Sequence, residues 1–326
     1  MRRNLVRVVD ALLLLWLVTS FTFALIHLAP GDPASLLISP TASAAEAERV
    51  RASLGLNAPL LTQYGRWLGS TLRGDLGESI ALARPVTDVI GDALPVSLLL
   101  GGVSLVASFG LGLLVGGAQA MRATRRTDTI LTVLTTTIYA APSFWLALAL
   151  VAMATSGAAW LGVPSWMRLP AFGMRDPASL ATGIAAWRDL GRHALLPLLV
   201  LSVPGAAGVA RYARGALLHA FAQPYVQAAR ARGVPREGLE WRYALRNAWT
   251  PLVVLLGLTL PGLIAGSVFV EQVFAWPGLG RVMLASIAAR DYPVVLGLTL
   301  VYAATVILSN LLADVAIERL DPRRRA

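Results

Sequence analysis

The sequence predicts an all-α, polytopic membrane protein with six transmembrane helices and a cytoplasmic helix-turn-helix loop. Its composition is the first reason, because 56% of the 326 residues are hydrophobic and only 14% are charged. Soluble domains carry about 25% charged residues, so this chain is too apolar for water. The second reason is spacing, since the apolar residues gather into six long runs separated by polar stretches.

The residue types that are missing exclude several kinds of chemistry. The chain has no cysteine, which excludes disulfides, a thiolate nucleophile and a metal site built on cysteine. It has no lysine either, so it has no P-loop, and any ATP used must be hydrolysed by another chain. The three histidines, His27, His193 and His219, lie far apart in the sequence and form no metal motif. We expect no enzyme activity, no cofactor and no metal.

Residues 1–94 form the predicted N-terminal region. Ala11–Leu28 is apolar, follows a basic start and is long enough to span a bilayer. A signal peptide has the same pattern, but bulky residues continue to Leu28 without a cleavage site, so we expect an uncleaved first span. Ala29–Leu94 is polar and is predicted to lie outside the cytoplasm, with amphipathic helices over Ala44–Leu54 and Leu60–Leu72.

Residues 95–315 hold the other predicted spans, and residues 316–326 form a basic cytoplasmic tail. The third span is expected to kink at Pro142, and the fourth is short and interrupted by Pro197 and Pro204. An outer connection precedes the last span and includes a short helix over Arg281–Arg290. The five spans are Pro95–Ala120, Ile130–Ala154, Ala194–Ala210, Leu252–Val270 and Pro293–Ala313.

The distribution of arginine predicts the orientation. Both ends of the chain, the Met121–Asp128 turn and the loop between the fourth and fifth spans together carry the net charge of +10. The segments on the other side are neutral in sum. Because cytoplasmic loops collect arginine, we expect both termini in the cytoplasm. The isoelectric point near 11.0 then reflects orientation and anionic lipid, not nucleic acid.

Tyr225–Pro251 is the longest strongly polar run of the chain. It predicts a helix to Arg232, a turn at Gly233–Pro235 and a second helix over Arg236–Ala248. Three interpretations compete: a solvated loop that anchors the topology, a DNA-binding helix-turn-helix, and a docking element for another protein. Flanking apolar spans argue against DNA binding, because no free domain surrounds the segment.

The same run carries a resemblance to a known family. Gln227-Ala228-Ala229, followed by Gly233 and then by Ala244-Leu245-Arg246, resembles the coupling loop of ABC importer permeases. Gln227 stands where that family has Glu, and Arg246 where it has Pro. ALRNAWTP at Ala244–Pro251, LAPGDP after the first span and VFAWPGLGR after the fifth are similar to the dipeptide, oligopeptide and nickel branch.

The resemblance implies a permease of the bacterial inner membrane that carries peptides or nickel complexes; the sequence does not say which. It implies four kinds of partner, which are a second homologous permease in a heterodimer, two cytoplasmic ATPase subunits, an external solute-binding protein and membrane lipid. The residues expected to couple this chain to an ATPase are Gln227, Ala228, Ala229, Arg230, Arg232, Gly233, Leu245 and Arg246.

No ionisable residue lies near the centre of a predicted span, which argues against a proton- or ion-driven carrier. The candidate gate or hinge residues are Pro142, Pro204, Pro261, Glu271 and Arg281. Kinks, close packing and interface anchoring are the ordinary alternatives for them. The alternative function is a membrane scaffold or sensor that transports nothing and recruits a cytoplasmic partner through its basic loop.

Overall fold

The computed structural model describes most of the chain as helices joined by turns. The residues it does not describe are 1, 30, 33, 35–36, 39–40, 54, 179, 181, 236–237, 240–242, 244, 261, 263–266 and 321–326. Among the described residues, the one pairing of β type is an isolated antiparallel bridge between Glu78 and Pro85. The all-α prediction is confirmed.

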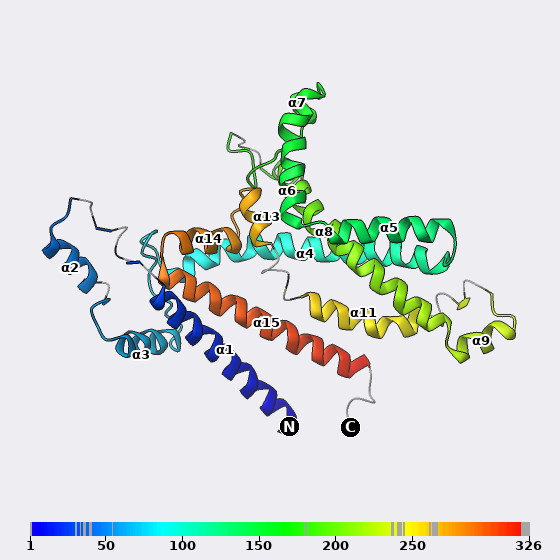
Figure 1. Cartoon of the computed structure of the whole chain (residues 1–326), viewed down its shortest axis with the longest axis horizontal. Coiled ribbons are helices and arrows are strands. Elements are labelled where there is room, and N and C mark those ends of the chain that lie inside the picture. The colour runs from blue at the N-terminus through cyan, green and yellow to red at the C-terminus, as the bar shows by residue number, and fades with distance from the viewer. Residues whose placement is uncertain are drawn as a thin grey trace. The chain divides into compact units, whose positions relative to one another are not determined.

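The helices follow one another along the whole chain (Figure 1). The first half contains α1 (Arg2–Leu28), α2 (Ala44–Ser53), α3 (Leu60–Thr71), α4 (Val86–Met121), α5 (Arg126–Ala140), α6 (Ser143–Ala152), a π-helix (Met153–Gly157) and α7 (Ala158–Trp160). A 3-10 turn (Ser165–Met167) leads to α8 (Ile184–Phe221), α9 (Pro224–Ala231), α11 (Arg246–Thr259), α13 (Val268–Val273), α14 (Leu279–Ala288) and α15 (Tyr292–Leu320).

The chain divides into two compact units. The first unit contains Met1–Ser97 and Pro277–Ile307. Its core lies where the start of α4 meets α15, and Val86, Val294 and Leu298 are fully buried there. Gly297 allows this contact, because a Cβ at that position would lie 2.7 Å from a methyl carbon of Val86. That separation is shorter than a packed core accepts.

Two buried hydrogen-bond sites fix the loops of the first unit. The carboxylate of Asp291, which precedes α15, accepts hydrogen bonds from the backbone N–H groups of Ile80 and Ala81 at 3.1 Å each, and from the Ser79 hydroxyl. The hydroxyl of Ser97 accepts a hydrogen bond of 2.8 Å from the N–H of Leu279 at the start of α14. Buried polar groups are therefore satisfied where the loops turn.

The second unit contains Leu98–Trp276 and Leu308–Ala326, and α8 is its central helix. α8 packs against α5, α6 and α11. Glycines on α4 let α8 approach closely. A Cβ at Gly112 would lie 2.8 Å from the carbonyl oxygen of Ala206, and one at Gly116 would lie 2.9 Å from the Cβ of Ala213. Small residues at such crossings favour close packing of membrane helices.

Five of the described helices are long and apolar enough to cross a membrane: Val6–Leu28, Val86–Met121, Ser143–Trp160, Ile184–Phe221 and Tyr292–Ala316. The shorter apolar helix Ala248–Thr259 covers the start of the predicted fifth span. Pro261 and residues 263–266 of that span lie outside the described residues. A polytopic membrane protein is confirmed, and the predicted fifth span, Leu252–Val270, stays a prediction.

Two predicted spans differ from the structure. The predicted third span, Ile130–Ala154, is not one kinked helix, because α5 ends at Ala140 and α6 begins at Ser143 after Pro142. Proline has no N–H to continue the helix and disfavours a helical residue before it. The predicted fourth span is not short or interrupted, since α8 passes through Pro197 and Pro204 for 38 residues. Membrane helices tolerate proline where neighbours satisfy the freed backbone groups.

The shorter predicted elements agree better. α2 and α3 match the two amphipathic helices predicted between the first two spans. α14 covers the short helix predicted near Arg281 but begins two residues earlier, at Leu279. The backbone turns at Gly278, which precedes α14 in an extended conformation.

Candidate functional site

The polar run Tyr225–Pro251 begins within α9, and a tight turn at Gly233 ends this helix. Gly233 has φ of +81°, a conformation that glycine adopts without strain. The N–H of Gly233 bonds to the carbonyl of Arg230 at 3.0 Å, and the N–H of Val234 bonds to that of Ala229 at 3.2 Å. This pair of bonds is a Schellman motif, and it satisfies the last carbonyls of the helix.

A small hydrophobic cluster holds α9 against the segment that follows the turn. Val226, Ala229 and Leu239 are buried in it, and Phe221, Val234 and Tyr243 pack around them. We call these six residues the hairpin core. Val234 closes the Schellman motif by packing against the same cluster. The hairpin core therefore holds α9 against Leu239 and Tyr243 beyond the turn.

The hairpin core changes the expected role of one residue. We expected Ala229 to contact a partner together with Ala228. Its side chain is instead fully buried within this chain. Ala229 is three residues after Val226, on the same face of α9, and that face points inward. Its small size serves packing within this chain.

The other residues predicted in the first part of the coupling loop are exposed. Gln227, Ala228, Arg230, Arg232 and Gly233 are all exposed. The amide of Gln227 donates a hydrogen bond of 3.2 Å to the carbonyl of Ala222, which leaves its side chain folded over the start of α9. A Cβ built on Gly233 meets no atom within 4 Å. The outer side of α9 and its turn thus carries Ala228, Arg232 and Gly233, whereas Arg230, four residues after the buried Val226, lies at the edge of the inward face.

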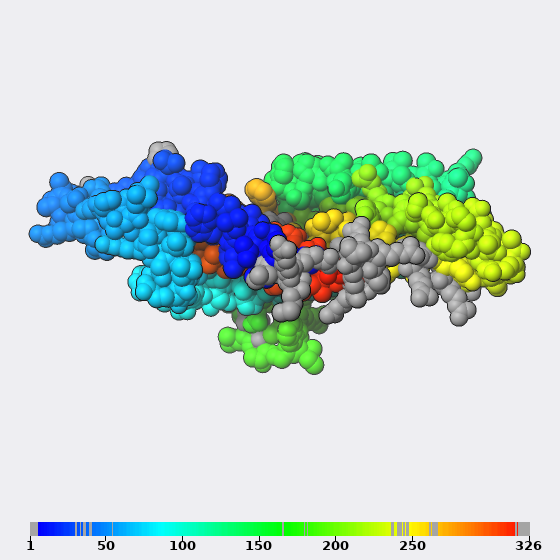
Figure 2. Space-filling view, turned by 90° about the horizontal axis from the view of Figure 1, so that it is seen from below, coloured from blue at the N-terminus to red at the C-terminus, as the bar shows by residue number. Residues whose placement is uncertain are grey.

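We call α9, its turn and the described residues that follow as far as Leu239 the α9 hairpin. A cavity of about 470 Å³ lies between this hairpin and the turn between α4 and α5. Arg230, Val234 and Leu239 line it from the hairpin, and Ala120 and Met121 line it from the end of α4. Figure 1 shows the α4–α5 turn and α9 at the same end of the second unit, and Figure 2 shows the yellow-green end of α8 with α9 at an extremity of that unit. The hairpin and the end of α4 therefore line the same cavity.

An ion pair fastens the α4–α5 turn to α8. Arg214 of α8 donates two hydrogen bonds of 2.8 Å to the carboxylate of Asp128, in the first turn of α5. The hydrogen bonds from Arg214 hold the pKa of Asp128 below its ordinary value, against the opposing effect of burial. Sequence reasoning missed this pair, because the partners are separated by 86 positions and Asp128 resembles any acidic residue at the start of a helix.

The end of the predicted coupling segment is only partly described. Leu245 precedes α11 and packs against a cluster that includes Ala213, Leu217 and Leu252. It therefore links the segment to α8 and α11. The side chain of Arg246 lies outside the described residues.

The structure describes four of the five candidate gate residues, and these four belong to different elements. Pro142 is exposed and sets the start of α6, whereas Pro204 lies inside α8. Pro261 lies outside the described residues. Glu271 of the second unit is fully buried and accepts a hydrogen bond of 2.7 Å from Ser267, and Arg281 is an exposed residue of the first unit. Their roles as a gate stay a prediction.

The described residues contain no group of three or more His, Cys, Asp or Glu side chains placed to hold a metal ion. The exposed side chains of the described residues 225–233 include the phenol of Tyr225, the amide of Gln227, the guanidinium groups of Arg230 and Arg232, and Ala228. The arrangement is suited to contact with another macromolecule.

Two family models together match almost the whole chain. The model described as "Binding-protein-dependent transport system inner membrane component" matches residues 108–326. The model of the N-terminal part of the same membrane components matches residues 1–101. The boundary between them falls within α4.

Curated relatives match over nearly their full length. The oligopeptide transport system permease protein AppB of Bacillus subtilis is 35% identical over 307 residues, 94% of this chain and 93% of that protein. The probable D,D-dipeptide transport system permease protein DdpB of Escherichia coli is 35% identical over 312 residues, 93% of this chain and 91% of that protein.

Solved structures share the fold. An inward-facing structure of the MetNI methionine ABC transporter contains a chain with a TM-score of 0.54 and 18% identity, covering 72% of this chain and 96% of that one. A chain of an amino acid ABC transporter crystallised with histidines gives the same TM-score at 15% identity, covering 72% of this chain and 94% of that one. At these identities the likeness concerns the fold alone.

Proposed function

This chain belongs to the family of binding-protein-dependent transport system inner membrane components, and from that premise we propose that it forms part of the path by which a bacterium imports peptides. The family is a family of transport permeases and not of enzymes. Relatives at 35% identity are named for oligopeptide and D,D-dipeptide transport, which supports peptides as cargo. Nickel complexes, the other cargo that the sequence suggested, have no support among these relatives.

The proposed transporter contains more than this chain. A second homologous permease completes the path as a heterodimer, two ATPase subunits hydrolyse ATP in the cytoplasm, and a solute-binding protein delivers the cargo from outside. Both termini and the α9 hairpin face the cytoplasm, because the two ends of the chain, the Met121–Asp128 turn and the loop that contains the hairpin together carry the net charge of +10.

The observation that carries the docking role is the outer face of α9. Ala228 and Gly233 let another surface come close, and Arg232 lies on the same side as Ala228. Arg230 is exposed at the edge of this face, and both arginines suit an acidic or polar rim. The hairpin core packs the inward face of α9, and the cavity beside it is also lined by the end of α4. We propose that an ATPase subunit binds this face and that closure of the ATPases pulls the hairpin and the spans behind it.

Gly233 offers a test that separates docking from folding. A tryptophan there would project into open space, away from this chain, and would occupy room that a partner needs. The left-handed φ costs any L-residue about 1–2 kcal/mol, so Gly233→Ala carries the same backbone strain with little bulk. The alanine variant is therefore the matched control.

The experiment is affinity purification from the native membrane, with identification of the proteins that copurify and measurement of peptide uptake. We expect the wild type and Gly233→Ala to retain ATPase subunits and a second permease. Gly233→Trp should insert at the same level but lose the ATPase subunits and peptide uptake. Retention of both by Gly233→Trp would show that α9 does not dock there.

A further inference from the structure

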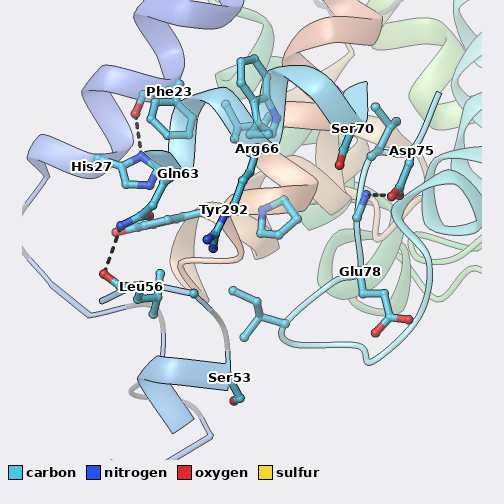
Figure 3. Close-up of a pocket in the computed structure, with 17 residues that line it drawn as sticks. Phe23, His27, Ser53, Leu56, Gln63, Arg66, Ser70, Asp75, Glu78 and Tyr292 are labelled. Carbon is cyan, nitrogen blue, oxygen red and sulfur yellow. Dashed lines mark hydrogen bonds between the residues drawn. The ribbon is translucent and has the colours of Figure 1, made fainter. Parts of the chain in front are cut away.

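The first unit contains a pocket that the docking role does not use. Its volume is about 400 Å³, within the range of about 300–1,000 Å³ typical of small-molecule sites. It lies at the end of α1, the start of α15 and one face of α3, and the turn before α4 closes its far side (Figure 3). We call it the outer pocket, because the proposed orientation places these helix ends outside the cytoplasm.

Aromatic rings form one wall of the outer pocket. Phe23 stacks on His27 at 4.0 Å between ring centroids and contacts Trp67 at 5.4 Å. His27 in turn lies 5.3 Å from the ring of Tyr292. Such a wall favours an apolar or aromatic side chain over water.

Hydrogen bonds hold this wall in place without a ligand. The hydroxyl of Tyr64 on α3 accepts a hydrogen bond of 2.9 Å from the indole N–H of Trp16 and shares another of 2.7 Å with Ser20, so α3 is fixed to α1. The amide of Gln63 donates to the carbonyls of Leu56 and Ala58 and fixes the turn before α3. The pocket is therefore preformed, which lowers the entropic cost of binding.

Two opposite charges face the outer pocket without neutralising each other. Figure 3 shows the Arg66 side chain extended from α3 into the pocket and the Glu78 side chain at its other edge. Within the described part of the chain, neither of them forms an ion pair. The third charged lining residue, Asp75, accepts the N–H of Gly77 at 2.9 Å and so stabilises its own turn. Arg66 and Glu78 are left to bind a ligand.

We propose that the outer pocket binds a short peptide with free termini before it enters the translocation path. The α-carboxylate would bind Arg66, the α-ammonium group would bind Glu78, and an apolar side chain would lie against Phe23, Trp67 and Tyr292. This inference rests on the proposed function for its peptide class. The pocket itself requires only a ligand with both charges and an apolar group.

The charge balance selects against other ligands. With Glu78 and Asp75 on its lining, the pocket disfavours a dianion such as inorganic phosphate. The headgroup of phosphatidylethanolamine is also zwitterionic, but it carries no apolar group to lie on the aromatic wall. A dipeptide with a phenylalanine side chain supplies all three features.

The test is equilibrium binding of radiolabelled phenylalanyl-alanine to the purified transporter in phosphatidylcholine nanodiscs, without binding protein or ATP. Arg66→Gln removes the proposed carboxylate partner, and Arg73→Gln is the matched control, because Arg73 is an exposed arginine just after α3 that does not line the pocket. We expect Arg66→Gln to weaken binding about tenfold or more, since hydrogen bonds to charged groups contribute about 1.5–3 kcal/mol. Arg73→Gln should leave binding unchanged.

A second set of binding measurements removes the charges of the ligand one at a time. N-acetylation or C-terminal amidation of the dipeptide should each weaken binding to the wild type, and amidation should have little further effect on Arg66→Gln. Equal binding by wild type and Arg66→Gln, or no binding at all, would overturn the proposal. Binding of glycerophosphoethanolamine in place of the dipeptide would also overturn it, in favour of a lipid headgroup.

A parallel uptake assay with the binding protein separates the two proposals. Normal peptide uptake without Arg66-dependent binding would refute the outer pocket and leave the importer function intact. A wild-type transporter that takes up no peptide would refute the peptide function, whatever the binding assay shows. Arg66-dependent dipeptide binding in that case would still establish the pocket as a peptide site.

Discussion

Asp128 accepts two hydrogen bonds of 2.8 Å from Arg214, one on each carboxylate oxygen. The carboxylate is nearly buried, whereas about a third of the guanidinium side chain is exposed. The pair joins the first turn of α5 to α8, next to the cavity that the α9 hairpin shares with the end of α4.

The first prediction concerns that pair. Asp128→Asn keeps the shape of the side chain but leaves the charge of Arg214 without its partner, and we expect a loss of about 2 kcal/mol of stability. Solvent around Arg214 keeps the loss below the cost at a fully buried pair. Thermal unfolding of the purified chain in detergent measures it. The control is Asp92→Asn, which removes an exposed pair with Arg84 and should cost under about 1 kcal/mol.

The pH dependence of the same pair gives the second prediction. The hydrogen bonds from Arg214 lower the pKa of Asp128 in the folded state below its ordinary value near 3.8. The pair therefore contributes fully above that value and loses its contribution as the pH falls through the lower, folded-state pKa. We expect the difference in melting temperature between wild type and Asp128→Asn to stay constant from pH 7 to about pH 5 and to shrink below about pH 4. A constant difference at all pH values would contradict the ion pair.

The third prediction compares two adjacent glycines of α4. A Cβ at Gly116 would meet the backbone of Ala210 at 3.0 Å or closer, whereas one at Gly117 meets no atom within 4 Å. Gly116→Ala should therefore force α4 and α8 apart and cost about 1–3 kcal/mol. Gly117→Ala should be neutral or stabilising by up to about 1 kcal/mol, because alanine is the better helix former. Equal melting temperatures of the two variants would show that α4 and α8 do not approach as described.

Much of the fold is predictable from composition and local pattern. The first two amphipathic helices and the turn at Gly233 follow from apolar spacing and from the residues that stop helices. The length of a helix does not follow from these local patterns, as α8 shows. Hydropathy marks the part of a helix that suits lipid, while α8 continues past it into polar turns that include Arg188 and Arg214. Pro197 and Pro204 predicted interruptions of this helix. Membrane helices tolerate proline where neighbouring helices satisfy the freed backbone groups.

The candidate site was predictable as a segment but not residue by residue. Ala228 and Ala229 are the same residue type, and Ala229 is buried because it lies on the Val226 face of α9, in one cluster with Leu239 beyond the turn. The ion pair of Asp128 and the outer pocket depend on residues far apart in the sequence, which one sequence cannot bring together. The sequence around Arg66 did not indicate a binding residue, because a lone arginine on an amphipathic helix ordinarily faces water.

The central claim is that the outer face of α9 binds an ATPase subunit, and site-specific cross-linking tests it most directly. The chain has no cysteine, so single cysteines can be introduced without removing any. Ala228 is exposed on the proposed docking face, its neighbour Ala229 is buried, and Leu61, 84% exposed on α3, lies on the proposed outer side. With a short cysteine-to-amine cross-linker in native membranes, Ala228→Cys should yield an adduct with an ATPase subunit. Ala229→Cys and Leu61→Cys should yield none. An ATPase adduct from Leu61→Cys, or none from Ala228→Cys in membranes that contain the ATPases, would contradict the account.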